Sequence, residues 1–189
     1  MSCKEKVETI KKKLGITIKD NHLVTIFWTY QVLVIALLYV IVRNAKTPSL
    51  LFIFTYLLIT TSIPILLYDE FFLKHFQHCK VFADPTNKAL FEIFGHSVSH
   101  WPVSHFFIWV CVTILCPQYW FSYLLLGIAW EGFEALMGMI KYPGKSTGHA
   151  VIKEKSVQYT TWWAHSPLDM VANIAGISLG LLLLHFFQN

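Results

Sequence analysis

The stretch LLLGIAWEGFEALMG at residues 124–138 joins a membrane-like apolar run to two carboxylates. Leu124 to Ala129 is apolar enough for a lipid-exposed helix, and Glu131 and Glu134 then follow within the same segment. The two glutamates are three residues apart, so they share one face of a helix. Ionisable side chains inside a membrane cost free energy unless they face one another or a wet cavity. The stretch therefore predicts a helix that forms one wall of a polar site.

The composition predicts an integral membrane protein. Of the 189 residues, 55% are hydrophobic and only 14% are charged, and the mean hydropathy is +0.52. These values exclude an ordinary soluble domain. The formal net charge is +4, but the lysines gather in a tail and two loops, which favours a cytoplasmic bias over nucleic-acid binding. The cysteines form no C-x-x-C pair, so we expect neither a disulfide framework nor a zinc site.

Five apolar runs predict an all-α bundle of about five transmembrane helices, at residues 24–42, 50–67, 103–116, 119–138 and 168–187. The third run is short for a crossing and needs either an extension upstream or a tilted packing. Pro117 marks a turn after it. Parts of the preceding loop, such as 88–99, are predicted as short interfacial helices.

The lysines predict the orientation of the single domain formed by residues 24–189. Lysine-rich segments are the tail 1–23 and the loops 68–102 and 139–163. Five spans place these three segments on one side, which should be cytoplasmic. The first apolar run lacks an obvious small-residue cleavage site, so it is interpreted as a retained span and not as a signal peptide.

Polar residues of three predicted helices converge at the cytoplasmic end of the bundle. His105 begins the third span, the two glutamates end the fourth, and Asp169 begins the fifth, with Asn173 one turn deeper. Asp169 and Asn173 are four residues apart and share a helix face. The sequence therefore predicts one polar site built from His105, Glu131, Glu134, Asp169 and Asn173.

The residue types in this site predict chemistry on a phosphate. Three carboxylates and an amide are hard oxygen ligands, which suit calcium or magnesium better than zinc. Without a cation, at least one of the clustered carboxylates would hold a proton. A histidine beside a cation is a suitable general base. A cation at the membrane interface could bind a lipid phosphate, which indicates phosphoryl or phosphatidyl transfer to an alcohol.

At these residues the chain resembles the eukaryotic base-exchange phosphatidylserine synthases, as a reduced core. The matching pieces are HFFIWVCVT at 105–113, YW at 119–120, EGFE at 131–134, WWAHSPLD at 162–169, and Asn173 followed by GISLG at 176–180. Their order and most of their spacings agree with the family pattern. The resemblance covers roughly residues 103–182.

The resemblance implies a calcium-dependent transferase that exchanges the choline or ethanolamine of a phospholipid for L-serine, without a nucleotide. It implies His105 as the base, with Glu131 also catalytic. It implies a Ca²⁺ site of Glu131, Glu134 and Asp169. The substrate-binding residues that it implies are Asn173, Trp109, Trp163 and His165. An unprocessed multi-span protein with lipid chemistry would suit the endoplasmic reticulum of a eukaryote or its virus.

Other interpretations stay open at this stage. LDMVANIAGISLG at 168–180 is also similar to VanZ-like membrane proteins, which favours a non-catalytic binder of a lipid or amphiphile. A small ion or proton carrier is less favoured, because the polar residues cluster at one end and do not thread the bilayer. His96 and His100 are four apart, but loop histidines are more often surface residues than metal ligands. Gly176 and Gly180 indicate close helix packing. The sequence leaves open a homodimer.

Overall fold

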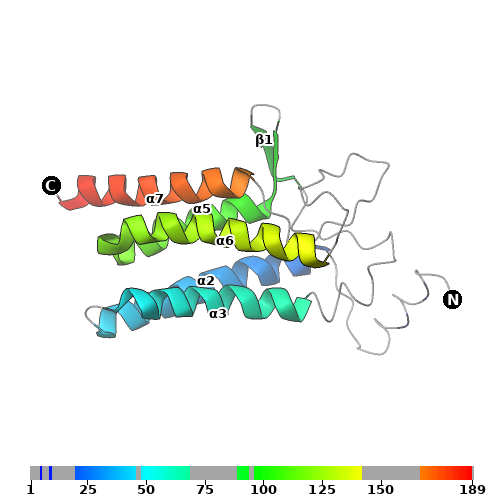
Figure 1. Ribbon diagram of the computed structural model, residues 1–189, viewed down its shortest axis with the longest axis horizontal. Coiled ribbons are helices and arrows are strands. Elements are labelled where there is room, and N and C mark those ends of the chain that lie inside the picture. The colour runs from blue at the N-terminus through cyan, green and yellow to red at the C-terminus, as the bar shows by residue number, and fades with distance from the viewer. Residues whose placement is uncertain are drawn as a thin grey trace.

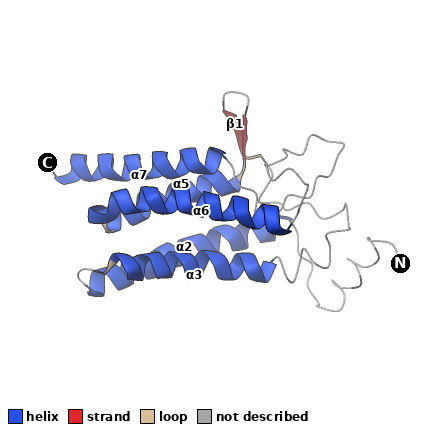
Figure 2. Cartoon of the chain, in the orientation of Figure 1, coloured by secondary structure: helices blue, strands red, loops and turns tan. Residues whose placement is uncertain are grey.

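The computed structural model describes residues 5, 9, 20–45, 48–68, 89–93, 96–141 and 167–188. In this part of the chain the ordered elements are α2 (Asp20–Ala45), α3 (Leu50–Tyr68), β1 (Phe91–Ile93), β2 (His96–Val98), α5 (His100–Leu115), the 3₁₀ turn η3 (Pro117–Tyr119), α6 (Trp120–Lys141) and α7 (Pro167–Gln188). Each of the five predicted apolar runs overlaps one α-helix. Figure 2 shows that helices make up most of the described part of the chain. The all-α prediction is confirmed.

The helices gather into one bundle whose long axis is horizontal in Figure 1. One end of the bundle, on the right in Figure 1, contains the beginnings of α2, α5 and α7 and the ends of α3 and α6. This alternation is the one that the sequence predicted. It places the first turns of α5 and α7 beside the last turns of α6.

The opposite end of the bundle is closed by two short connections. Ser49 precedes α3, and its hydroxyl accepts a hydrogen bond from the Phe52 amide at 3.2 Å, which satisfies one of the exposed donors of a helix start. The Tyr119 hydroxyl in η3 donates to the Pro48 carbonyl at 3.2 Å. The α2–α3 connection is thereby tied to the α5–α6 turn.

The chain breaks its helix at Cys116 and Pro117. Proline has no amide hydrogen and its ring clashes with a continuing helix. The Cys116 carbonyl accepts hydrogen bonds from the Tyr119 amide at 3.2 Å and from the Tyr123 hydroxyl at 3.0 Å. The helix axis turns by 115° between His100–Leu115 and Pro117–Met137. The predicted turn at Pro117 is confirmed. Of the two alternatives for the short third run, the structure shows the upstream extension, because α5 begins at His100.

Two glycines bring α7 against α5. A methyl group added to Gly176 would lie 2.5 Å from the Phe106 carbonyl oxygen, and one added to Gly180 would lie 2.8 Å from Cβ of Thr113. Real side chains do not approach so closely, so each position requires glycine. Small residues four apart allow helix backbones to pack closely in a membrane. The close-packing interpretation of Gly176 and Gly180 is confirmed.

Two tyrosines join α2 to α3 reciprocally. The Tyr56 hydroxyl of α3 donates to the Val34 carbonyl of α2 at 2.7 Å. The Tyr30 hydroxyl of α2 donates to the Thr60 carbonyl of α3. Thr60 lies four residues before Pro64, which has no amide hydrogen to offer. Tyr30 therefore supplies the hydrogen bond that the helix itself cannot form.

All five helices contribute to one apolar core. Its buried members are Leu38 of α2, Ile53 and Leu57 of α3, Trp109, Val112 and Cys116 of α5, Tyr123 of α6 and Ile177 of α7. The Trp109 and Tyr123 rings meet at 5.7 Å between centroids. The helices therefore form one bundle and not two separate hairpins.

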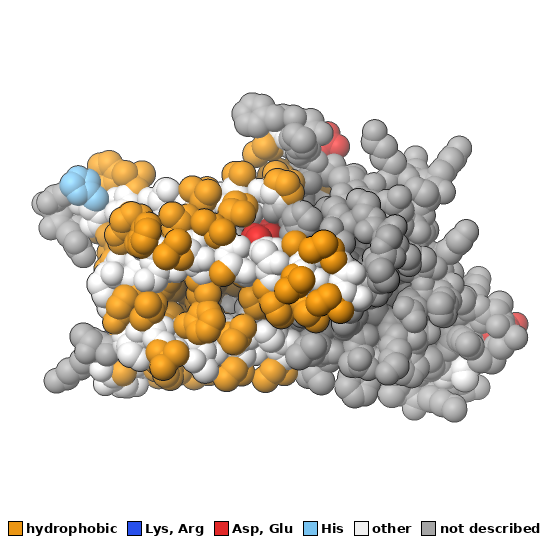
Figure 3. Space-filling view, viewed as in Figure 1, with side chains coloured by type: hydrophobic (Ala, Val, Ile, Leu, Met, Phe, Trp, Pro, Cys, Tyr) orange, Lys and Arg blue, Asp and Glu red, His pale blue; other side chains and the backbone are white. Residues whose placement is uncertain are grey.

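The outer faces of the helices are strongly apolar (Figure 3). Exposed side chains include Leu33 at 61%, Leu51 at 73% and Phe187 at 85%, more apolar surface than monomeric soluble proteins usually present. Among the described residues, Val24–Ala45 and Pro167–Phe187 are long and apolar enough to cross a membrane, and the bent α5–α6 pair would be a third if it counts as one span. These features are consistent with a membrane protein.

Two details differ from the sequence prediction. Residues 91–93 and 96–98 pair as antiparallel strands, with Phe91 opposite Val98, so the prediction of interfacial helices within 88–99 is wrong there. The β-branched Ile93 and Val98 suit a strand, and the chain must reverse before α5 begins. In addition, α2 begins at Asp20 and takes in the last residues of the predicted tail 1–23. The rest of that tail lies outside the described residues, apart from Glu5 and Thr9.

Candidate functional site

The polar residues predicted to converge do meet inside the bundle. His105 comes from the second turn of α5, Glu131 and Glu134 from the second half of α6, and Asp169 and Asn173 from the first two turns of α7. The last four are 3–6% exposed, and the His105 side chain is 15% exposed. Figure 3 shows red acidic atoms within an otherwise apolar surface between α6 and α7. Burial of so many polar groups in an apolar bundle makes this cluster a candidate functional site.

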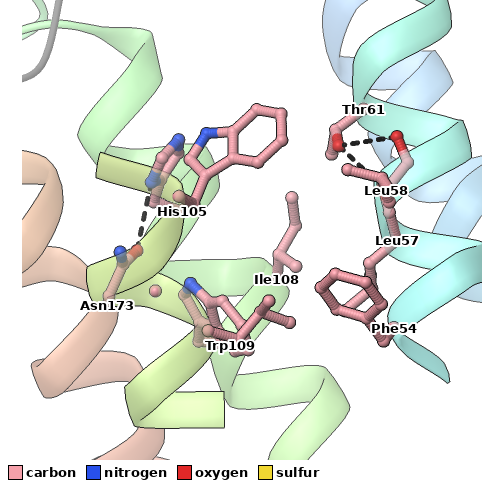
Figure 4. Close-up of a pocket in the computed structure, with 11 residues that line it drawn as sticks. Phe54, Leu57, Leu58, Thr61, His105, Ile108, Trp109 and Asn173 are labelled. Atoms are coloured by element: carbon pink, nitrogen blue, oxygen red, sulfur yellow. Dashed lines mark hydrogen bonds between the residues drawn. The ribbon is translucent and has the colours of Figure 1, made fainter. Parts of the chain in front are cut away.

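Asn173 fixes the orientation of the His105 ring. Nδ1 of His105 lies 3.0 Å from Oδ1 of Asn173, and Figure 4 shows this bond between α5 and α7. An amide oxygen only accepts hydrogen bonds, so Nδ1 of a neutral His105 carries the hydrogen. The other ring nitrogen, Nε2, then has an available lone pair. Among the described residues, the structure gives Nε2 no hydrogen-bond partner.

Glu131 lies behind the same ring nitrogen. Its Oε1 atom is 3.9 Å from Nδ1 of His105. A carboxylate at this position stabilises positive charge on an imidazole that has taken up a proton. Two acceptor groups thus lie on the Nδ1 side of the ring.

Glu134 is held by a tryptophan of its own helix. Nε1 of Trp130 donates to Oε1 of Glu134 at 2.7 Å, across one turn of α6. Glu134 is also within electrostatic range of Glu131 and Asp169. The three carboxylates thus occupy one region, and Trp130 orients the carboxylate of Glu134.

Gly127 makes room for Asn173. A methyl group on Gly127 would lie 3.1 Å from the amide nitrogen of Asn173. Gly127, Glu131 and Glu134 follow one another at helical spacing on a single face of α6. The face that carries the carboxylates therefore also admits the side chain that orients His105.

Carboxylate oxygens are the type of ligand that a hard divalent cation prefers, but the positions of these side chains fit a metal site less well. Three buried carboxylates together require protons or a cation to balance their charge. In the described part of the chain the one Arg, Arg43, is in the last turn of α2, at the other end of the bundle. Among the described residues, however, no group of three or more His, Cys, Asp or Glu side chains is arranged to hold a metal ion. A Ca²⁺ site remains a prediction.

An apolar pocket of about 80 Å³ adjoins the site (Figure 4). Its lining comes from α3, α5, α6 and α7, and consists of Phe54, Leu57, Leu58, Thr61, His105, Ile108, Trp109, Leu126, Gly127, Trp130 and Asn173. Figure 4 shows His105 and Asn173 on one side and the α3 residues across from them. His105 and Asn173 therefore form the polar edge of an otherwise apolar cavity.

The remaining predicted site residues have different outcomes. Trp109 lines the pocket and packs on Tyr123, which makes it a wall of the cavity as well as part of the core. Trp163 and His165 lie outside the described residues. His100 is buried at the start of α5, where its Nδ1 accepts a hydrogen bond from Nε1 of Trp28 at 2.9 Å. His96 lies in β2, so the two histidines do not share a helical face.

The sequence did not lead us to two tryptophans whose indole nitrogens donate hydrogen bonds to Glu134 and His100. Trp130 precedes Glu134 by four residues, the spacing at which helical side chains meet, and this signal was available. Trp28 lies 72 residues before His100, and nothing in the sequence connects them.

No protein family, curated protein or solved structure matches this chain. The resemblance to base-exchange phosphatidylserine synthases and to VanZ-like proteins therefore remains a prediction from the residues quoted above.

Proposed function

We propose that this chain is a membrane phospholipid head-group transferase, similar to phosphatidylserine synthases, which exchanges a lipid head group for L-serine. The observation that supports the proposal most is the hydrogen bond from Nδ1 of His105 to Asn173. It orients a buried imidazole with Nε2 available, and Glu131 lies on the side where positive charge would develop. A positioned imidazole with an available ring nitrogen is suited to general-base catalysis.

The proposed reaction is balanced without an oxidant or a nucleotide. The serine hydroxyl oxygen forms a bond to the lipid phosphorus, and its proton moves to Nε2 of His105. The bond between phosphorus and the oxygen of choline or ethanolamine breaks, and the leaving alcohol takes the proton from His105. The histidine thus acts first as base and then as acid, and it returns to its starting state at the end of the exchange.

The carboxylates would hold a divalent cation in this proposal. Glu131, Glu134 and Asp169 are the candidate ligands because hard cations prefer carboxylate oxygen. Such an ion would neutralise charge on the lipid phosphate. We further propose that all five helices cross the bilayer, and that the end of the bundle with the site faces the cytoplasm, in the endoplasmic reticulum of a eukaryotic host.

The proposal is tested by incorporation of labelled L-serine into lipid. Purified protein in vesicles of phosphatidylcholine and phosphatidylethanolamine, with calcium, should form labelled lipid. The His105→Ala variant should not, whereas His185→Ala should keep full activity because His185 is an exposed residue in the last turn of α7. Equal activity of folded His105→Ala and wild type would refute the role of the base.

A non-catalytic lipid binder is the second candidate. The observation that favours it is the apolar pocket beside His105, which does not require chemistry. It predicts lipid binding by the wild type and no head-group product under any cation condition.

A further inference from the structure

We infer that the pocket between α3 and the α5–α7 helices binds one acyl chain of a membrane phospholipid, which enters laterally between α3 and α6. The proposal rests on the proposed function in one respect only, which is that the head group of the same lipid would lie at His105. The binding of the chain itself depends on the pocket alone.

The pocket wall suits hydrocarbon and not water. Most of the lining side chains are apolar. The polar ones make hydrogen bonds within the protein, apart from Nε2 of His105 at the edge of the pocket. The Thr61 hydroxyl donates to the Leu57 carbonyl at 2.6 Å, and His105 and Asn173 bond to each other. A water molecule in a cavity needs two to four polar partners, and this wall offers few. A hydrocarbon chain would therefore contact mostly apolar side chains in this pocket.

The pocket is large enough for only a short segment of an acyl chain. Its volume of about 80 Å³ is roughly half that of a cavity known to hold benzene, ~150 Å³. It therefore accommodates a few carbon atoms of a flexible chain and not a whole ring-bearing molecule. The rest of such a chain must extend out of the mouth of the pocket.

The mouth of the pocket is continuous with apolar outer surface. Leu58 lines the pocket and is 38% exposed, and Ile59 beside it is 49% exposed. On α6, Leu125 and Ile128 flank the lining residues Leu126 and Gly127 and are 53% and 47% exposed. If these surfaces contact lipid, the medium at the mouth is hydrocarbon. A phospholipid chain can then pass from the bilayer into the pocket without crossing water.

The packing of the bundle permits this lateral path. α7 is locked onto α5 through Gly176 and Gly180, whereas α3 is bonded by Tyr56 and Tyr30 to α2. The pocket lies between these two units. One wall of the pocket is α3, and the two tyrosine hydrogen bonds of α3 connect it to α2 and not to α6.

The test is photo-crosslinking of the full chain in phosphatidylcholine vesicles that contain a little phosphatidylcholine with a diazirine in its acyl chain. Labelled peptides are mapped by mass spectrometry. We expect adducts enriched at Phe54, Leu58 and Leu126 relative to the exposed residues Leu33 and Leu37. Leu58→Trp, which fills the mouth, should lower the pocket adducts about tenfold, equivalent to ~1.4 kcal/mol. The matched variant Leu51→Trp, on the same helix at a residue that is 73% exposed and does not line the pocket, should leave them unchanged.

The outcomes separate this inference from the proposed function. Pocket adducts that Leu58→Trp removes support the inference even if no serine is incorporated, and the protein is then a lipid binder. Label spread evenly over exposed apolar residues, or an equal effect of both tryptophan variants, overturns the inference even if serine incorporation is robust.

Discussion

The Nδ1 atom of His105 and the Oδ1 atom of Asn173 lie 3.0 Å apart across the interface between α5 and α7. This bond depends on close helix packing, because Gly176 lies three residues beyond Asn173 and contacts the α5 backbone at Phe106. The geometry of the candidate base is therefore coupled to the glycine interface. A substitution in the glycine interface should therefore also disturb the hydrogen bond between His105 and Asn173.

Asn173→Ala should lower kcat for serine incorporation by roughly 10- to 100-fold, the usual cost of losing an orienting partner. The KM for lipid should change less. Asn173→Asp keeps an acceptor for the Nδ1 hydrogen and should retain more activity than the alanine variant. Equal activity of the two variants would show that the hydrogen bond does not orient the base.

Trp130→Phe should weaken the response to the divalent cation. The substitution keeps an aromatic wall in the pocket but removes the Nε1 hydrogen that Glu134 accepts at 2.7 Å. The cation concentration that gives half-maximal activity should rise several-fold. Trp120→Phe is the matched control, since Trp120 is 43% exposed at the start of the same helix. The same cation titration for both variants would contradict a role for Trp130 in positioning Glu134.

Gly176→Ala should destabilise the folded protein by about 1–3 kcal/mol, the usual cost of overpacking a tight interface. The new methyl group would meet a backbone oxygen at 2.5 Å, which cannot rotate away. Gly132→Ala on α6 is the control, because nothing lies within 4 Å of its added methyl group. Unfolding in detergent should show a lower free energy of unfolding for Gly176→Ala and an unchanged one for Gly132→Ala.

Tyr30→Phe should cost about 1 kcal/mol in the free energy of unfolding, because the Thr60 carbonyl loses its donor. In a Pro64→Ala background residue 64 regains an amide hydrogen for Thr60, so the same substitution should cost less. A double-mutant cycle measures this coupling. An identical cost in both backgrounds would show that Tyr30 does not compensate for the proline.

Much of the fold followed from local chemistry. Apolar runs of bilayer length predicted the helices, and the alternation of the chain placed His105, Glu131 and Asp169 at one end of the bundle. The break at Pro117 and the glycine packing of α7 also followed from residue type. These features depend on covalent geometry and on periodicity, both of which are visible in the sequence.

The details of the site depended on contacts between distant residues. The bond from Trp28 to His100 and the choice of Asn173 as the partner of His105 require the relative rotation of helices, which no single helix specifies. The short β1–β2 hairpin has only three residues in each strand, too few for a clear alternating pattern. The pocket arises where helices do not pack, and sequence patterns do not report such gaps.

The most direct test of the proposed exchange is the stoichiometry of head-group release and serine incorporation. The protein would be reconstituted with phosphatidylcholine that carries a labelled choline, together with L-serine bearing a second label and calcium. We expect one choline released for each serine incorporated, with both lost on chelation of calcium and in His105→Ala. Choline release without serine incorporation would indicate hydrolysis. Neither product from folded protein with calcium present would contradict the proposed transferase.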